Sequence, residues 1–221
     1  MIRHSWDITP AKAIALQRKL AGLVRVEPLG RPIRTVAGVD CAFLDGGRSI
    51  VTAAVLCDAK SWAVLASSTD RRRCQFPYVP GLLSFREAPS VIAAVKRLPG
   101  RVDLLMCDGQ GVAHPRGVGL ASHVGLWLDA PTIGVAKSRL CGEHRPVGLR
   151  RGCRRRLVLE GRVIGAVVRT RSDVKPLYVS VGHLITLDQA VAWVLRSAAH
   201  VRLPEPTRRA HQLVSRIKAG R

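Results

Sequence analysis

Apolar residues near the start of the chain recur at helical spacing and then give way to strand-like runs. Residues 8–24 carry apolar side chains along one helical face, and Thr9-Pro10 supplies an N-cap followed by a proline suited to the first helical position. After a Pro/Gly turn, three runs bounded by turn residues predict strands at Thr35–Phe43, Ser49–Cys57 and Trp62–Ser68. The breaks at residues 45–47 and 58–61 favour hairpins between these strands.

Helices and strands alternate through the middle of the chain. A helix is predicted over residues 85–98, and the continuous apolar run Val102–Cys107 is typical of a strand buried on both faces. The glycine-rich loop Asp108–Gly119 then leads into a predicted helix at Leu120–Leu128 and a second buried strand at Pro131–Lys137.

The C-terminal third is predicted to add a basic loop, three strands and two helices. In chain order these elements are Arg150–Arg156, Arg156–Leu159, Val163–Arg169, Leu177–Gly182, Asp188–Ala199 and Thr207–Lys218. The first two strands form a hairpin about Glu160-Gly161. Three antiparallel strands followed by helix, strand, helix and strand indicate a single α/β domain over residues 1–221, with an RNase H-like mixed β-sheet flanked by helices.

The net charge of the chain gives information about its binding partner. The chain of 221 residues carries a formal net charge of +21, with a sequence pI of about 11.4. Such a basic domain has the electrostatic footprint of a nucleic-acid binder, although high charge also aids solubility. Most of the cations are arginines, whose planar guanidinium suits phosphate contacts, and genome composition is the alternative cause of that excess. With 47% hydrophobic residues a core of ordinary size can form.

The cysteines and the apolar runs exclude several classes of protein. None of the six cysteines belongs to a C-x-x-C pair, which argues against a zinc ribbon. Several lie inside apolar runs, so the cysteines are interpreted as small buried hydrophobic residues in a reducing compartment. The N-terminus lacks the apolar region of a secretory signal, and no run approaches the roughly 18 residues of a membrane span. We therefore expect a soluble cytoplasmic protein that does not bind membranes.

Three acidic residues stand where a carboxylate needs an explanation. Asp40 lies inside an apolar strand, Asp108 ends the run Leu104–Cys107, and Glu87 lies at the edge of the apolar stripe on the helix between them. Taken singly, each has an ordinary structural explanation. Asp40 could pair with an arginine, Glu87 could close a capping box with Ser84, and Asp108 could open an Asx turn.

Together the three carboxylates indicate a metal site. A strand, the following helix and the end of the next strand can bring their oxygens to one place, and clustered carboxylates hold Mg²⁺ ready for phosphates. In two-metal nucleases, ions about 3.5–4 Å apart act on the attacking and leaving oxygens of the phosphodiester. The pattern predicts a metal-dependent nuclease and leaves open whether one or two ions bind.

An ordered series of short motifs resembles the endonuclease V family and covers about residues 35–211. The motifs are Val39-Asp40, Pro77-Tyr78-Val79-Pro80-Gly81, Ser84-Phe85-Arg86-Glu87, Asp108-Gly109-Gln110-Gly111-x-x-His114-Pro115-Arg116, Gly119-x-Ala121-Ser122-His123, Gly134-Val135-Ala136-Lys137 and Leu203-Pro204-Glu205-Pro206-Thr207-Arg208. Each motif is short, but their ordered combination is highly specific.

The resemblance implies a fold, a reaction and a cofactor. It implies an RNase H-like catalytic domain that nicks DNA at the second phosphodiester bond 3′ to deoxyinosine, leaving 3′-hydroxyl and 5′-phosphate ends. The reaction would begin the repair of deaminated adenine, with Mg²⁺ as cofactor and Mn²⁺ as a substitute. The expected partner is DNA containing deoxyinosine, bound by a monomer.

The resemblance also assigns residues to the reaction centre. It implies metal ligands at Asp40, Glu87 and Asp108, with His211 as an additional catalytic position at the metal site. Lys137 matches the family's lysine near the scissile phosphate, where it would neutralise charge that develops in the transition state. Taken alone, Lys137 could equally be a surface lysine at a strand end.

A second set of residues matches the part of the family that binds the damaged base. Tyr78 matches the aromatic residue of a strand-separating wedge, within the stiff segment formed by Pro77, Val79, Pro80 and Gly81. Gly81, Gly109 and Gly111 would let backbone groups approach a flipped base, and His114 would lie beside it. Without the resemblance, Pro77–Pro80 would be a rigid turn and His114 a loop histidine. His123, His183 and His200 are interpreted as structural.

Other functions remain open from the sequence. The Arg150–Arg156 stretch matches no family motif and is either a solvated loop or an extra contact with nucleic-acid backbone. A structure-specific nuclease of the same fold, such as a Holliday-junction resolvase or a ribonuclease H, would need no wedge at Pro77–Gly81. A non-catalytic nucleic-acid-binding protein would explain the charge but not the carboxylates. The preference for DNA over RNA, including inosine in RNA, also stays open, as does the range of other lesions.

Overall fold

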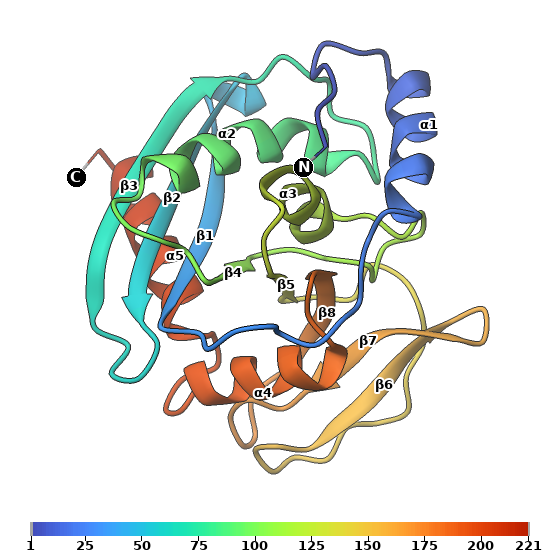
Figure 1. Ribbon diagram of the computed structural model, residues 1–221, viewed down its shortest axis with the longest axis vertical. Coiled ribbons are helices and arrows are strands. Elements are labelled where there is room, and N and C mark those ends of the chain that lie inside the picture. Colours follow the sequence, from blue (N-terminus) through green and yellow to red (C-terminus); the bar gives the residue numbers. More distant parts are fainter. Residues whose placement is uncertain (1, 221) are drawn as a thin grey trace.

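One eight-stranded mixed sheet organises the chain (Figure 1). The computed structural model describes residues 2–220. In chain order the strands are β1 (Thr35–Leu44), β2 (Ser49–Asp58), β3 (Val64–Arg73), β4 (Leu104–Cys107), β5 (Thr132–Ala136), β6 (Arg154–Leu159), β7 (Arg162–Val168) and β8 (Leu177–His183). The helices are α1 (Pro10–Ala21), α2 (Leu83–Arg97), α3 (Leu120–Leu128), α4 (Leu187–Ser197) and α5 (Glu205–Lys218), with a short 3₁₀ turn η1 (Asp45–Gly47).

The sheet changes from antiparallel to parallel at its centre. Its order is β3-β2-β1-β4-β5-β8-β7-β6, with β4 parallel to both β1 and β5 and all other neighbours antiparallel. Strands buried on both faces read as continuous apolar runs, which is why β4 and β5 consist of buried residues throughout. The RNase H-like mixed sheet predicted from the order of elements is confirmed.

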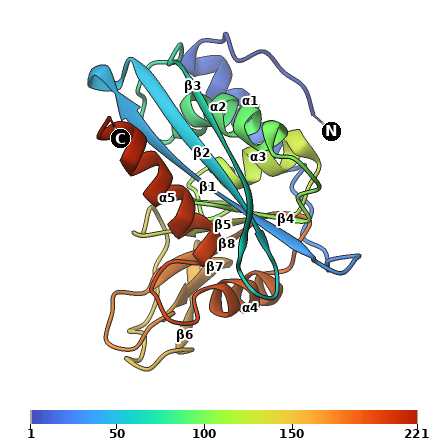
Figure 2. The ribbon, with the colours of Figure 1, turned by 90° about the vertical axis from the view of Figure 1, so that its left-hand side faces the viewer.

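Helices cover both faces of this sheet (Figure 2). Alternate residues of the central strands point to opposite faces. Ala37, Val39 and Leu105 pack with α2 and α3, whereas Val36 and Leu104 pack with α4. Helix α5 lies against β1 and β2 on the side opposite α2. The site-bearing helices α2 and α5 therefore approach β1 from opposite sides.

Two predicted boundaries need correction. Strand β3 runs from Val64 to Arg73 rather than over Trp62–Ser68, because α2 covers one face of this edge strand and its polar residues can point to solvent. Of the predicted basic loop, Arg154–Arg156 open the edge strand β6 with exposed side chains. The arginines there can keep their heads in water while their backbone pairs with β7.

The capping box, which was the alternative explanation of Glu87, does not form. Helix α2 begins at Leu83, with Leu82 as its N-cap and no side-chain cap bond. Ser84 therefore lies inside the helix, where its hydroxyl is buried and bonds to the ring of His123. Glu87 is left with no capping role, so its burial needs another explanation.

Two further expectations can be compared with the structure. Among the helices of residues 2–220, none has both the length and the apolar character needed to cross a membrane. All six cysteines are free, but only Cys57 and Cys107 are buried and the other four are partly exposed.

A glycine in β1 lets α5 reach the sheet. A Cβ at Gly38 would lie 2.1 Å from the carbonyl carbon of Pro206, at the start of α5, so no side chain fits between them. The absence of that side chain brings the backbones of β1 and α5 into contact. This close approach places His211 of α5 opposite Asp40 of β1.

Replacing Gly38 by alanine is expected to lower the free energy of unfolding by about 1–3 kcal/mol, because the added methyl group overpacks the β1–α5 contact. Chemical denaturation measures this loss. The matched control is Gly30→Ala, where an added Cβ meets no atom within 4 Å, and its stability should stay within about 0.5 kcal/mol of the unmodified protein. Equal stability of both variants would contradict the close contact.

Candidate active site

The parallel register of β1 and β4 brings two carboxylates together. Val39 pairs with Cys107, and the backbone N–H of Asp108 continues the ladder by donating to the Val39 carbonyl at 3.2 Å. Asp40 and Asp108, the next residues on the two strands, are therefore neighbours. Asp108 follows the carboxyl end of β4, and Asp40 lies within β1 at the point where its parallel pairing with β4 ends. Ligands of open α/β sheets gather at the carboxyl ends of such parallel strands.

Helix α5 adds a histidine to this pair. His211 donates from Nδ1 to Oδ2 of Asp40 at 2.6 Å. Potential ligand atoms of Asp40, Asp108 and His211 all lie within 4.8 Å of one another. The structure therefore brings the predicted residues Asp40, Asp108 and His211 into one compact group that could hold a metal ion.

Glu87 approaches the same place from α2 but lies outside the compact group. Its side chain is only 8% exposed. Burial, followed by repulsion from Asp40 and Asp108, raises the pKa of Glu87 to about 8. A carboxyl group whose proton is retained by nearby negative charge is poised to exchange that proton for a cation.

Lys137 compensates only part of the negative charge. It follows β5 and forms an ion pair with Oδ2 of Asp108. Burial and the neighbouring Asp40 nevertheless keep the pKa of Asp108 raised, against the lowering effect of Lys137. Three clustered carboxylates with one lysine leave the site short of positive charge, and hard oxygen donors with one imidazole fit Mg²⁺ or Mn²⁺.

A pocket of about 270 Å³ opens beside the carboxylates. Glu87 and Asp108 line it on one side, and Tyr78, Val79, Pro80 and Gly81 line it on another, together with Gly109 and His114. Tyr78 stands at the rim with 69% of its surface exposed, and Pro77, which is also exposed, lies outside the lining. The predicted wedge thus shares one cavity with Glu87 and Asp108 of the predicted metal site, whereas Asp40 and His211 lie outside its lining.

The loop that carries Tyr78 is fixed through one carbonyl group. Gly81, at φ +79°, presents its carbonyl to Nε2 of His114 at 3.0 Å, to Arg116 at 2.7 Å and to Gln17 at 3.1 Å. Nδ1 of His114 accepts from the Arg116 backbone, so both ring nitrogens are used inside the protein. Burial and the Arg116 charge lower the pKa of His114 to about 4, which keeps the ring neutral. His114 therefore holds the loop in place.

The two remaining glycines have different surroundings. Gly109 lines the pocket, whereas Gly111 does not. A Cβ at Gly111 would lie 2.0 Å from the Val181 carbonyl oxygen, and its N–H donates to Ser180. Close packing against β8 accounts for Gly111 without any approach to a base.

Comparison with known proteins identifies the family. Residues 18–212 match the sequence model of the family described as Endonuclease V. The chain belongs to the endonuclease V family. The endonuclease V of Azotobacter vinelandii is 48% identical over 211 residues, which cover 96% of both chains.

Solved structures of the endonuclease V family have the same fold. The crystal structure of the endonuclease V of Streptomyces avermitilis superposes with a TM-score of 0.92 at 43% identity, covering 99% of this chain and 97% of that one. The Ciona intestinalis endonuclease V, in complex with a 24mer DNA that contains an inosine followed by a ribo-adenosine, gives a TM-score of 0.79 at 21% identity. The superposition covers 95% of this chain and 98% of the Ciona intestinalis chain. At 21% identity it shows a common fold only.

Several residues that line or support the pocket of this endonuclease V family member are not predicted from the sequence. Gln17 of α1 is completely buried, donates to the Gly81 and Val118 carbonyls and accepts from Arg116. Ser84 and Leu140 also line the pocket. The sequence contains a sign of the role of Gln17, because it is a polar residue on the otherwise apolar face of α1 and therefore needs a buried hydrogen-bond partner. Leu140, in an irregular loop, gives none.

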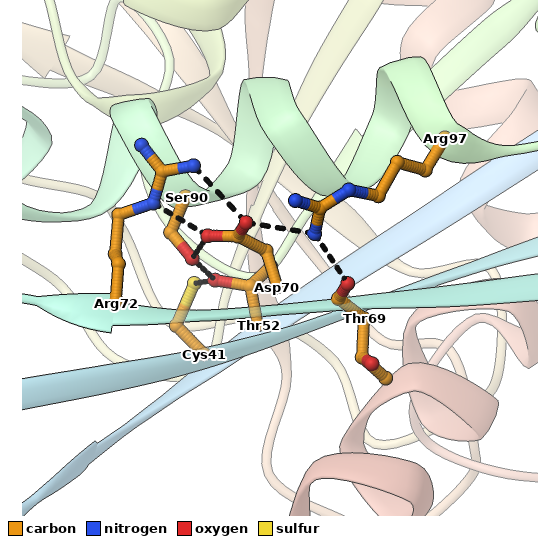
Figure 3. A network of polar contacts seen from close by, with 7 residues as sticks. All are labelled: Cys41, Thr52, Thr69, Asp70, Arg72, Ser90 and Arg97. Atoms are coloured by element: carbon orange, nitrogen blue, oxygen red, sulfur yellow. Dashed lines mark hydrogen bonds and ion pairs between the residues drawn. The ribbon is translucent and has the colours of Figure 1, made fainter.

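A buried polar network fixes α2 to the sheet near the carboxylates (Figure 3). Asp70 of β3 accepts bonds from two arginines and from Ser90 of α2 at 2.9 Å. Thr52 of β2 donates to Ser90 at 2.8 Å, and the thiol of Cys41 lies 3.1 Å from Thr52. The backbone N–H of Cys41 in turn donates to Oδ1 of Asp40. The network therefore links the helix that carries Glu87 with the strand that carries Asp40.

Replacing Glu87 by glutamine is expected to stabilise the metal-free protein at high pH. Because the pKa of Glu87 rises from 4.5 to about 8 on folding, its stabilising effect is fully present below pH 4.5 and is lost as the pH rises through about 8. Thermal unfolding in EDTA should therefore show a smaller loss of Tm between pH 5 and pH 9 for Glu87→Gln than for the unmodified protein. The control Glu160→Gln, at an exposed turn, should follow the unmodified protein. Parallel curves for all three proteins would contradict the assignment.

Proposed function

We propose that this protein is a Mg²⁺-dependent endonuclease that nicks DNA at the second phosphodiester bond 3′ to deoxyinosine. The observation that carries the proposal is the shared lining of one pocket by Glu87, Asp108 and the loop of Tyr78. A site that holds an everted base beside a group of carboxylates can recognise a lesion and cut the strand next to it. Membership of the endonuclease V family, shown by the match over residues 18–212, supports the choice of an endonuclease reaction.

The metal site is proposed at Asp40, Glu87 and Asp108, with His211 as a further member and Mn²⁺ as an alternative ion. Support comes from the compact group of potential ligand atoms and from the raised pKa of Glu87. When bound there, Mg²⁺ would supply Lewis-acid stabilisation of charge on the phosphate and a supply of nucleophilic water at neutral pH.

Lys137 is proposed to neutralise charge on the scissile phosphate. Its ammonium group already lies at Asp108, on the edge where the strands of the sheet end. Positive charge held in place before the reaction stabilises a developing negative charge without reorganisation. The lysine therefore serves the metal-free site as a counterion and the substrate complex as an electrostatic catalyst.

Tyr78 is proposed to fill the gap that an everted base leaves in the duplex. Its ring is exposed, while the loop beneath it is held by Gln17, His114 and Arg116. A rigid aromatic plate can stack on the bases that remain, and the pocket behind it can take the extruded one.

We further propose that the protein acts as a monomer in the cytoplasm, a reducing compartment in which its six cysteines stay free.

Asp108→Asn is expected to abolish nicking and to retain most DNA binding, because it removes a metal-site charge and leaves the basic surface intact. The assay uses matched strands with inosine or adenine, as DNA and as RNA, with mapped product ends and with or without Mg²⁺. The control Asp7→Asn changes an exposed carboxylate and should cut normally. Near-normal turnover by Asp108→Asn would defeat the metal assignment, and nicking of inosine RNA alone would redirect the proposal from DNA to RNA.

Tyr78→Ala should reduce the preference for inosine over adenine more than it reduces attachment to DNA. Stacking on an aromatic side chain is worth about 1–3 kcal/mol per base in single-strand binders, which sets the scale of the loss. Tyr78→Phe keeps the aromatic plate and is expected to keep the preference. If Tyr78→Ala discriminates as well as the unmodified protein, Tyr78 is no wedge.

The arginines of β6 are expected to contact the backbone of nucleic acid. Among residues 2–220, the side chains of Arg154 and Arg156 make no polar contact with the rest of the protein, whereas Arg151 donates to the Leu195 carbonyl and is held by α4. Arg154 and Arg156 are two residues apart on a strand and therefore share one face.

Replacing Arg154 and Arg156 by glutamine should flatten the dependence of log K on log salt by about 0.9 for each phosphate that the protein no longer neutralises. The preference for inosine should change little, because phosphate contacts position a protein without reading bases. The matched control replaces the exposed Lys60 and Lys96 by glutamine. A salt slope that falls equally in both double variants, or in neither, would refute a specific role for β6.

A further inference from the structure

One arginine joins three segments of the chain at the edge of the sheet that carries the site. Nη2 of Arg202 donates to the Lys137 carbonyl oxygen at 3.0 Å and to the Pro176 carbonyl oxygen at 3.1 Å. Its Nε donates to the Lys175 carbonyl oxygen at 2.8 Å. Lys137 follows β5, residues 175–176 precede β8, and Arg202 belongs to the loop between α4 and α5. A single guanidinium group therefore holds together three loops that are far apart in sequence.

The backbone of Lys137 lies just beyond the strand pairing that holds β5. In the ladders between β5 and its two neighbours, the last paired residue is Ala136. The next two carbonyl groups are instead bonded by side chains, because the Lys137 carbonyl accepts from Arg202 and the Ser138 carbonyl accepts from Gln110 at 3.0 Å. The position of the Lys137 backbone therefore depends on side-chain contacts.

The backbone of Arg202 is itself anchored. Its carbonyl oxygen accepts from the hydroxyl of Thr170 at 2.6 Å, and Thr170 is buried in the loop that follows β7. Three residues after Arg202 begins α5, whose Pro206 backbone packs directly against Gly38 of β1. The guanidinium group therefore extends from a backbone that is fixed on both sides of the residue.

An arginine is suited to this position in a way that a lysine is not. The guanidinium group is planar and carries five N–H donors in fixed directions, whereas an ammonium group is a compact donor on a flexible stem. A carbonyl oxygen can only accept, so the direction of all three bonds from Arg202 is settled. Three bonds from one planar group fix the three carbonyl oxygens relative to one another.

We propose that Arg202 is a positioning residue for Lys137, which holds the backbone of that lysine so that its ammonium group stays beside Asp108 and the scissile phosphate. This inference rests on the role proposed above for Lys137 and adds the residue that places it. The side chain of Lys137 is 36% exposed, so it has room to turn toward solvent once its backbone is released. Arg202 acts on the reaction only through the lysine.

The expected effect is on the rate of the chemical step. A misplacement of about 1 Å in a catalytic group can cost roughly 100-fold in rate, so Arg202→Ala is expected to lower kcat about 10–100-fold. The value of KM for DNA should change little, because the contacts that attach the backbone of the nucleic acid remain. Arg202→Lys keeps the charge but lacks the planar fork, and it should behave like Arg202→Ala.

A double-mutant cycle separates positioning from a general structural role. Lys137→Ala removes the group that Arg202 serves, so adding Arg202→Ala to that variant should lower kcat by less than about threefold. The control Arg101→Ala removes an exposed arginine that pairs with Asp103 at 3.0 Å before β4, and it should cut normally. An equal loss of kcat from Arg202→Ala in both backgrounds would overturn the inference. Weaker DNA binding with a shallower salt slope and an unchanged kcat would also overturn it, since Arg202 would then be a phosphate contact.

Chemical labelling of lysines tests the same inference without any substrate. The ion pair with Asp108 should retard the reaction of the Lys137 amine with acetic anhydride. Mass spectrometry should therefore show severalfold faster acetylation of Lys137 in Arg202→Ala, whereas the exposed Lys60 should react at the same rate in both proteins. Equal rates at Lys137 would overturn the inference. Failure of the unmodified protein to nick inosine DNA would instead refute the proposed function, and the labelling would still show whether Arg202 places the lysine.

Discussion

Repulsion among carboxylates at one point of the sheet is the constraint on which the site depends. Asp40, Glu87 and Asp108 approach one another from two strands and a helix, and among the lysines and arginines of residues 2–220 only Lys137 forms an ion pair with any of them. Burying such charge is unfavourable unless a cation joins it. The fold tolerates the arrangement because a proton on Glu87, whose pKa is raised to about 8, relieves part of the repulsion in the metal-free protein. At a pH above the pKa of Glu87 the repulsion lowers the stability of the metal-free protein, and a cation bound at the proposed site would relieve it.

The surrounding structure holds these groups in place in two ways. Glycines allow close contact between backbones, and polar side chains form hydrogen bonds between elements. Gly38 lets α5 touch β1, and Gly111 lets the pocket loop pack on β8. On the other side of the sheet, the network from Asp70 to Cys41 joins α2 to the strands. The proposed metal site is therefore held from both faces of the sheet, so its geometry depends on residues that lie outside the group of potential ligands.

The spacing of apolar residues along the chain is sufficient to predict the helices and strands, but not all of the contacts between them. The apolar runs of β4 and β5 and the helix Leu120–Leu128 are predicted nearly to the residue, because burial on both faces leaves a strong signal. The position of Asp40 next to Asp108 follows from the parallel register of β1 and β4. The role of Gln17 could not be predicted, because it depends on a contact across more than 60 residues of chain. The sequence could not decide between a capping box and a metal-site role for Glu87, because a serine three residues before a glutamate fits a cap that this helix does not use.

The saturation of one carbonyl has a consequence for how the protein searches DNA. Three side chains hold the Gly81 oxygen, so the loop beneath Tyr78 is already ordered before any duplex arrives. A preorganised probe loses little conformational entropy on contact, and the cost of inspection then falls on unstacking the DNA. If Tyr78 acts as the proposed wedge, damaged pairs that open easily would be sampled quickly, whereas sound pairs would be released before they open. With a rigid loop in the protein, the rate at which a base pair opens would then determine how long each site on the DNA is inspected.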